Sequence, residues 1–202
     1  MTDRVEQGTV ANERLTATTS VVLIALLLGE GVTILFLRPL LPVHIFVGML
    51  LIPPVALKLA TTGYRLVRYY TGNAAYVRRG PPHIALRLLA PVLVVATLTV
   101  FGTGVSLLAL GPHSGRGIVL GLHKASFVVW LAVAGVHVLA YLPRLPRLVF
   151  ARAGAARRFG LVAASVGAGL ILAWTTYSLA APWLHHHERG DDDHSGALTS
   201  AS

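Results

Sequence analysis

Two histidines, His123 and His137, lie in the fourth of five long apolar stretches of the chain, with thirteen residues between them. In a helix, steps of about 100° per residue bring their side chains to within roughly 40° of one another, so both lie on one face. They are about 21 Å apart along the axis, one toward each side of a hydrocarbon core about 30 Å thick. A polar side chain inside a bilayer costs free energy and indicates function by default. Each imidazole thus has the place that a haem ligand would take, one per leaflet.

A third histidine, His44, lies near the start of the second apolar stretch. The second and fourth stretches run in the same direction through the membrane, and His123 likewise lies near the start of its stretch. His44 and His123 are therefore expected at similar depth near the outer face, with His137 about four turns deeper. The residue at the depth of His137 on the second stretch is Lys58, so the two stretches read His-x13-Lys and His-x13-His.

The absence of cysteine excludes disulfides, iron–sulfur ligation, thiolate ligation of haem and covalent haem attachment. Histidine is then the natural ligand for iron or another metal, and the chain has nine histidines. Only His44, His123 and His137 fall within apolar stretches. The others lie between the stretches or in the C-terminal tail, namely His83, His113, His185, His186, His187 and His194.

The composition predicts that these histidines are carried by membrane-spanning helices. Hydrophobic residues make up 54% and charged residues 12% of the 202 residues, and the mean hydropathy is +0.68. These values are too apolar for a soluble domain of this size. Five stretches of about 19 to 25 residues are long enough to span a bilayer as helices. They cover residues 17–37, 43–61, 86–110, 118–142 and 159–181. The predicted fold class is all-α, an integral membrane bundle of five transmembrane helices.

The first four helices are expected to form a core, with the fifth packed outside it. This core covers residues 17–142, after a cytoplasmic tail at 1–16 and before a basic cytoplasmic loop at 143–158. The fifth helix covers residues 159–181, and 182–202 form an extracytoplasmic tail that is rich in His and Asp and predicted to be disordered. The first stretch lacks a basic n-region and an A-x-A cleavage site, so we interpret it as an anchor rather than a signal peptide.

The net charge of +9 is distributed unevenly along the chain. Arginines without any acid crowd the connections between the second and third and between the fourth and fifth stretches. They are Arg65, Arg68, Arg78, Arg79, Arg87, Arg144, Arg147, Arg152, Arg157 and Arg158. By the positive-inside rule these connections are cytoplasmic, so the N-terminus is predicted inside and the C-terminus outside the plasma membrane. The partner of these charges is predicted to be the lipid bilayer, with its anionic headgroups, and no nucleic acid.

The histidine arrangement resembles that of the b-type membrane cytochromes, in which two haems lie between the second and fourth helices of a four-helix core. Each haem in that family is held by one histidine from each helix. The resemblance covers approximately residues 17–142 and implies haem b as the cofactor. Position by position, it implies that His44 and His123 ligate the iron of an outer haem and that His137 ligates an inner one.

The inner level departs from the family, because Lys58 stands where the family has the second inner ligand. A lysine near a cytoplasmic helix end commonly extends to lipid phosphates instead. His83, at the inner edge of the third stretch, is an alternative partner for His137. We therefore predict one firmly held haem and leave a second haem open. Pro53-Pro54 predicts a kink between His44 and Lys58, which makes their alignment less regular.

Small and acidic residues near the outer level leave further alternatives open. Gly29 and Gly31 on the first stretch, with Gly102 and Gly104 on the third, fit the close approach of a macrocycle and fit close helix packing equally well. The one acid within a stretch, Glu30, is expected to pair with Lys124 or Arg38, with proton carriage near the outer haem as the alternative.

The function predicted from these features is electron transport by a bis-histidine haem. The chain would carry electrons between quinol or a partner oxidoreductase and an acceptor, as a membrane subunit of an oxidoreductase. The alternative is a non-redox membrane protein, a transporter subunit or scaffold, whose histidines serve packing or proton relay. The tail histidines 185, 186, 187 and 194 have the composition of a divalent-metal ligand set, against the alternative of a solvated tail.

Overall fold

The computed structural model describes residues 2–78, 80, 84–112, 116–150 and 154–183, which form helices and turns and contain no strand. Five helices in this part of the chain are long and apolar enough to cross a bilayer. They are α1 (Thr2–Leu35), α2 (Leu37–Tyr70), α4 (Ile84–Leu110), α5 (Arg116–Tyr141) and α7 (Ala155–Thr176). The short helices are α3 (Ala74–Arg78), η1 (Leu142–Arg144), α6 (Leu145–Val149) and η2 (Tyr177–Ala180). The predicted all-α class is confirmed, and the chain is a multi-pass membrane protein.

The helices α1 and α2 are longer than the hydropathy pattern predicts. Each has 34 residues, which is about 51 Å of helix against a hydrocarbon core of about 30 Å. Helix α1 includes residues that the sequence placed in a tail, and α2 begins at Leu37 instead of residue 43. Only Phe36 separates the two helices. A hydropathy window ends where polar residues begin, whereas a helix continues as long as its backbone bonds and its packing are maintained.

Helix α2 continues without interruption through Pro42, Pro53 and Pro54. A proline removes one backbone donor and crowds the preceding turn. In membrane helices this cost is tolerated where neighbouring helices support the freed backbone groups. Pro54 is nearly inaccessible to solvent, so α2 is supported by neighbours at this point.

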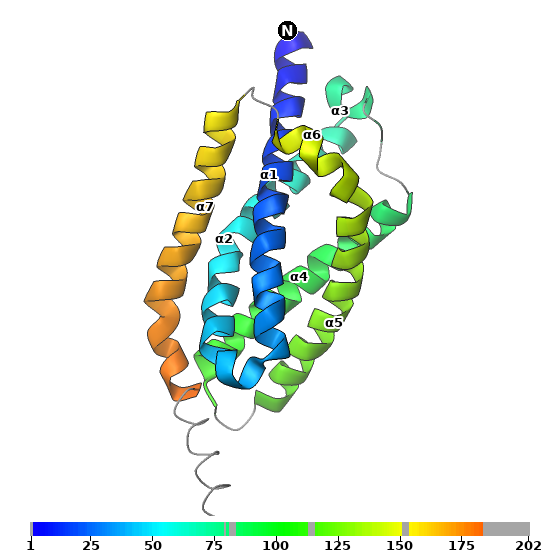
Figure 1. The fold of residues 1–202 in the computed structure, drawn as a ribbon. Coiled ribbons are helices and arrows are strands. Elements are labelled where there is room, and N and C mark those ends of the chain that lie inside the picture. Colours follow the sequence, from blue (N-terminus) through cyan, green and yellow to red (C-terminus); the bar gives the residue numbers. More distant parts are fainter. Residues whose placement is uncertain (1, 79, 81–83, 113–115, 151–153, 184–202) are drawn as a thin grey trace, which may run out of the picture.

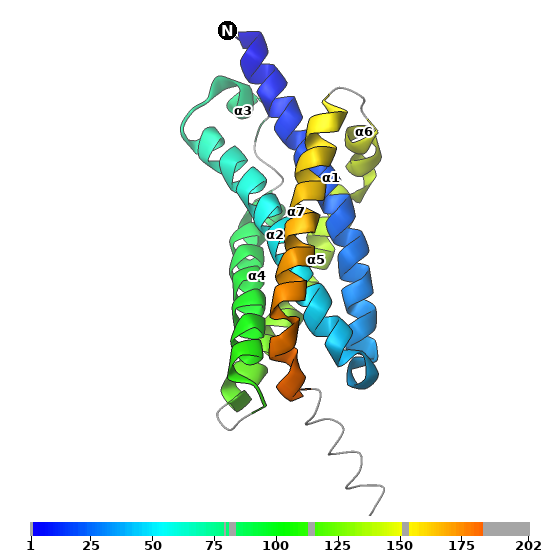
Figure 2. The same cartoon turned by 90° about the vertical axis from the view of Figure 1, so that its left-hand side faces the viewer.

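The helices α1, α2, α4 and α5 form a four-helix bundle (Figure 1). Helix α1 packs along α2, α2 contacts α4, and α4 packs along α5. After α5 the chain returns to α1 through the contact of α6. This order places α2 and α5 at opposite corners of the bundle. Helix α7 packs on α2 and α1, outside the four (Figure 2).

The two ends of the bundle differ in character. The N-terminus of α1 lies at one end with α3 and α6, and the last described residues lie at the other end (Figure 1). We call the first the arginine-rich end and the second the Phe36 end, after the turn between α1 and α2. Helix α5 also starts at the Phe36 end. His44 and His123 each lie seven residues after the start of their helices, at Leu37 and Arg116, and therefore lie at the same end.

Polar side chains join α1 to α2 toward the arginine-rich end. Asn12 Nδ2 donates to the carbonyl of Thr61 at 3.1 Å, and Arg65 forms an ion pair with Glu13 at 3.6 Å. Such contacts explain why α1 remains helical beyond its apolar part, because its polar residues are satisfied by α2.

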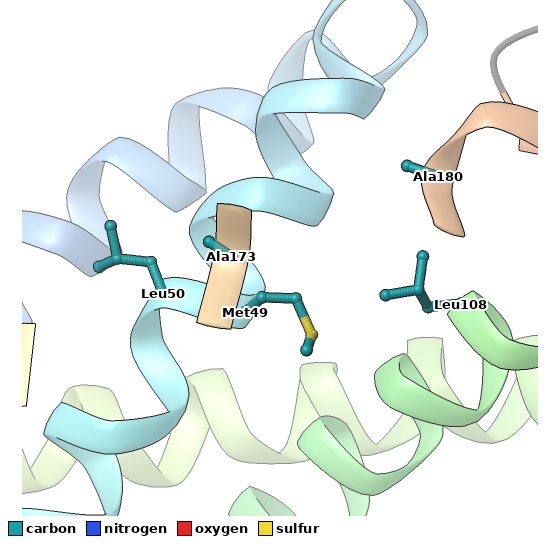
Figure 3. Close-up of a cluster of buried hydrophobic side chains, with 5 residues drawn as sticks. All are labelled: Met49, Leu50, Leu108, Ala173 and Ala180. Carbon is teal, nitrogen blue, oxygen red and sulfur yellow. The ribbon is translucent and has the colours of Figure 1, made fainter. Parts of the chain in front are cut away.

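An apolar cluster toward the Phe36 end joins α2, α4, α7 and η2 (Figure 3). Its buried members are Met49, Leu50, Leu108, Ala173 and Ala180. Ile45 and Phe46, which follow His44 directly, pack against this cluster, and the ring of Phe46 meets Tyr177 edge-on at 6.3 Å. The cluster therefore fixes the helical turn that carries His44.

Candidate functional site

His44 is held by a carboxylate from the neighbouring helix. Its Nδ1 lies 2.8 Å from Oε1 of Glu30, on the last turns of α1. The hydroxyl of Thr33 lies 3.1 Å from the same Nδ1 and donates to the carbonyl of Glu30 at 2.6 Å. Glu30 and Thr33 are three residues apart on one helix and so share a face. Both are buried, with 9% and 3% of their surface exposed.

The predicted pairing of Glu30 is wrong. Lys124 or Arg38 was expected, yet both residues are exposed, and among the described residues the carboxylate of Glu30 contacts His44 and Thr33 instead. The reason is the short turn at Phe36, which folds α2 directly back along α1. His44 on the second turn of α2 is thereby brought beside Glu30.

His123 is held by neutral groups of α4. Its Nδ1 lies 3.0 Å from the carbonyl oxygen of Val100 and 3.0 Å from the hydroxyl of Thr103. The Thr103 hydroxyl donates to the carbonyl of Thr99 at 2.6 Å, so toward His123 it acts as an acceptor. Two acceptors thus converge on one ring nitrogen.

These contacts define which nitrogen of each ring carries the proton. A carbonyl oxygen only accepts hydrogen bonds, so the neutral ring of His123 has its proton on Nδ1. The carboxylate of Glu30 imposes the same form on His44. In both rings the lone pair is then on Nε2, for which the described part of the chain offers no hydrogen-bond partner. This is the form in which histidine binds a metal through Nε2 while a neighbouring acceptor orients the ring.

The structure brings His44 and His123 to one region of the bundle without joining them. They lie on α2 and α5, each seven residues from the helix start at the Phe36 end. No hydrogen bond connects the two rings among the described residues. Each of α2 and α5 thus carries one imidazole whose Nδ1 is bound to an acceptor, the type of side chain that can ligate a metal through Nε2.

At the level of His137, nearer the arginine-rich end, the described residues offer one imidazole. Nδ1 of His137 lies 3.0 Å from the carbonyl of Val133, one turn earlier in the same helix, so this ring also has its lone pair on Nε2. The amine of Lys58 donates to the hydroxyl of Ser20 and to the carbonyl of Thr16 at 3.3 Å, both on α1. Lys58 is therefore directed to α1 and is engaged there. In the described chain it makes no hydrogen bond with His137, its expected partner at this level.

One of the four glycines named from the sequence contacts a candidate ligand. A Cβ added to Gly104 would lie 3.3 Å from Cε1 of His123, which is a tight contact. A Cβ added to Gly29, Gly31 or Gly102 would meet nothing within 4 Å. These three glycines therefore do not serve close helix packing in the described part of the chain, whereas Gly104 makes room for the imidazole.

The remaining histidines named from the sequence lie outside the described residues. They are His83, His113, His185, His186, His187 and His194. Within the described ranges, no three His, Cys, Asp or Glu side chains gather as a metal site. The prediction of metal binding by the tail stays untested.

Sequence reasoning missed the residues that orient the two rings. Thr33 and Thr103 each lie 3.0–3.1 Å from a histidine Nδ1, and neither was named. For Thr33 a signal was present, because it stands three residues after the one acid within an apolar stretch. The role of the Val100 carbonyl left no signal, since a backbone group carries no residue type.

Comparison of the chain with protein-family models, with curated proteins and with solved structures gives no match.

Proposed function

We propose that this protein is a b-type membrane cytochrome, in which Nε2 of His44 and Nε2 of His123 hold one haem b toward the Phe36 end of the bundle. The observation that carries the proposal is the matched state of the two rings. They stand on opposite helices at the same end, and each has Nδ1 bound to an acceptor and Nε2 without a hydrogen-bond partner among the described residues. His137 has the same ring state, but the described residues place no second imidazole opposite it.

The haem supplies one-electron redox chemistry, and the protein residues hold and orient it. Glu30 and Thr33 fix the ring of His44, while Val100 and Thr103 fix the ring of His123. Gly104 leaves space beside the second ring. Electrons would come from quinol or from a partner oxidoreductase and pass to an acceptor. The arginine-rich end would lie on the cytoplasmic side of the plasma membrane.

His44→Ala and His123→Ala test the ligands. Each variant should lose the absorbance of a low-spin haem or convert it to a high-spin spectrum, since a bis-imidazole field needs both rings. The measurement is the optical spectrum of the purified protein before and after dithionite reduction. Wild-type protein that is colourless from haem-replete cells, or a low-spin spectrum retained in both variants, contradicts the proposal.

Haem stoichiometry follows from the same preparations. Among the described residues His137 has no opposing imidazole at its level, so a pyridine-haemochrome assay should give about one haem per chain. His137→Ala should then keep the low-spin spectrum and serves as the matched control on α5. A value of about two haems per chain would mean that the inner level binds haem as well.

A second function is favoured by one observation, the direct contact of Glu30 with His44 at 2.8 Å. A carboxylate and an imidazole in contact within a bilayer are also the parts of a proton relay. A non-redox transporter subunit would use them in this way and would need no haem. The colour of the purified protein separates the two functions.

A further inference from the structure

The two proposed ligands differ in what binds their Nδ1 atoms. His44 faces a carboxylate at 2.8 Å, whereas His123 faces a backbone carbonyl and a hydroxyl, both at 3.0 Å. The first contact is charge-assisted and the second is neutral. The outer level is thus chemically asymmetric, although the sequence places a histidine at the same depth on each helix.

The carboxylate is built into this position rather than reaching it from solvent. The side chain of Glu30 is 11% exposed, and Oε1 contacts His44 while Oε2 lies 3.3 Å from the Thr33 hydroxyl. On the α2 side, a Cβ added to Gly48 would lie 3.7 Å from Oε1, so α2 passes beside the carboxylate at ordinary contact distance. Both oxygens therefore have defined neighbours.

We infer that Glu30 is a positioning residue that makes His44 the more strongly electron-donating of the two ligands and thereby lowers the reduction potential of the haem. The inference rests on the proposed function. Hydrogen bonds to a charged acceptor are roughly twice as strong as neutral ones and give the donating imidazole more anionic character. A more basic ligand favours ferric over ferrous iron, as does a nearby negative charge, and hydrogen bonding around the ligands is one of the levers on haem potential.

Glu30→Gln is the variant that tests this role, because it keeps an acceptor oxygen of the same reach and removes the charge. The equilibrium constant for reduction of the haem should rise about tenfold, which corresponds to a rise of about 59 mV in the reduction potential of a one-electron couple. The measurement is a redox titration of the haem absorbance. The ferric EPR g values should shift as well, since they respond to the donor strength of the axial ligands.

Thr103→Val is the matched control on the other ligand. It removes a neutral acceptor from Nδ1 of His123 and leaves the Val100 carbonyl in place. In this variant the equilibrium constant for reduction of the haem should change by less than about twofold. A Glu30→Gln potential equal to that of the wild type, or an equal shift in Thr103→Val, overturns the inference.

If Glu30→Gln does not retain haem, the variant to measure is Glu30→Asp. It keeps the carboxylate charge and moves it one methylene farther from His44. A rise of about threefold in the equilibrium constant supports the inference, and no change or a fall overturns it. The result is separable from the proposed function. Wild-type protein without haem refutes the function itself, whereas wild-type protein with a low-spin haem that is insensitive to both Glu30 variants refutes only the role of Glu30.

Discussion

At the scale of single residues, Gly104 controls the space available to the ring of His123. A Cβ at this position would be 3.3 Å from Cε1 of His123, and the two methyl groups of a valine would extend further into the ring. Gly102, two residues earlier on α4, would place a Cβ in open space. The two glycines share a helix and a residue type, so they form a matched pair.

Gly104→Val should displace the imidazole and weaken binding of the proposed haem, with Gly102→Val as the control. Overpacking costs about 1–3 kcal/mol, which corresponds to roughly 5- to 150-fold in affinity. Haem content per chain after washing, together with the fraction of low-spin spectrum, measures the effect. Equal haem content in the two variants would show that Gly104 does not serve the ring.

Residue types were sufficient to select the candidate ligands, but not to find what holds them. His44 and His123 could be named from the sequence because a histidine in an apolar stretch is uncommon and helical spacing fixes its depth. The contact of Glu30 with His44 could not, because it depends on how tightly the chain turns at Phe36. The two ring orientations were equally hidden, since one of the groups responsible is the backbone carbonyl of Val100.

At the scale of elements, the docking of α7 on α2 depends on one glycine. A Cβ on Gly169 would overlap the backbone carbonyl of Leu50, and a backbone group cannot rotate away as a side chain can. Gly169 and Ala173 are four residues apart on α7 and share the face that packs against α2. Gly167, on the same helix, would place a Cβ in open space.

Gly169→Val should therefore destabilise the bundle, while Gly167→Val should not. Overpacking of about 1–3 kcal/mol corresponds to a fall in Tm of about 2–12 °C for a chain of this length. Thermal unfolding in detergent, followed by circular dichroism, measures the difference. If both variants have the same Tm as the wild type, the packing of α7 does not depend on this close approach.

The number and type of the elements were predictable, whereas their ends were not. Long apolar runs predict spanning helices directly, because each backbone polar group in lipid must be bonded within the helix. Beyond their apolar runs, α1 and α2 are joined instead by polar contacts such as those of Asn12 with Thr61 and of Glu13 with Arg65. Spacing within one helix cannot reveal these contacts. The same limitation explains why Lys58 is directed to α1 and not to the level of His137.

At the scale of the whole molecule, the two ends of the bundle have different charge. Arginines concentrate around α3, α6 and the ends of the helices next to them, whereas His44, Glu30 and His123 lie toward the Phe36 end. An odd number of spanning helices places the start of α1 and the last described residues on opposite sides. Because positive loops are retained in the cytoplasm, the arginine-rich end is predicted inside and the proposed haem outside.

This orientation can be tested by labelling introduced cysteines. The chain has no native cysteine that would react with the label. Ala74→Cys places an exposed thiol on α3 at the arginine-rich end, and Ser195→Cys places one in the C-terminal tail. A membrane-impermeant maleimide applied to intact cells should label residue 195 and spare residue 74, and permeabilised cells should label both. Labelling of residue 74 alone in intact cells would invert the topology. The proposed haem would then face the cytoplasm and exchange electrons with partners on that side, while the ligands His44 and His123 would be unaffected.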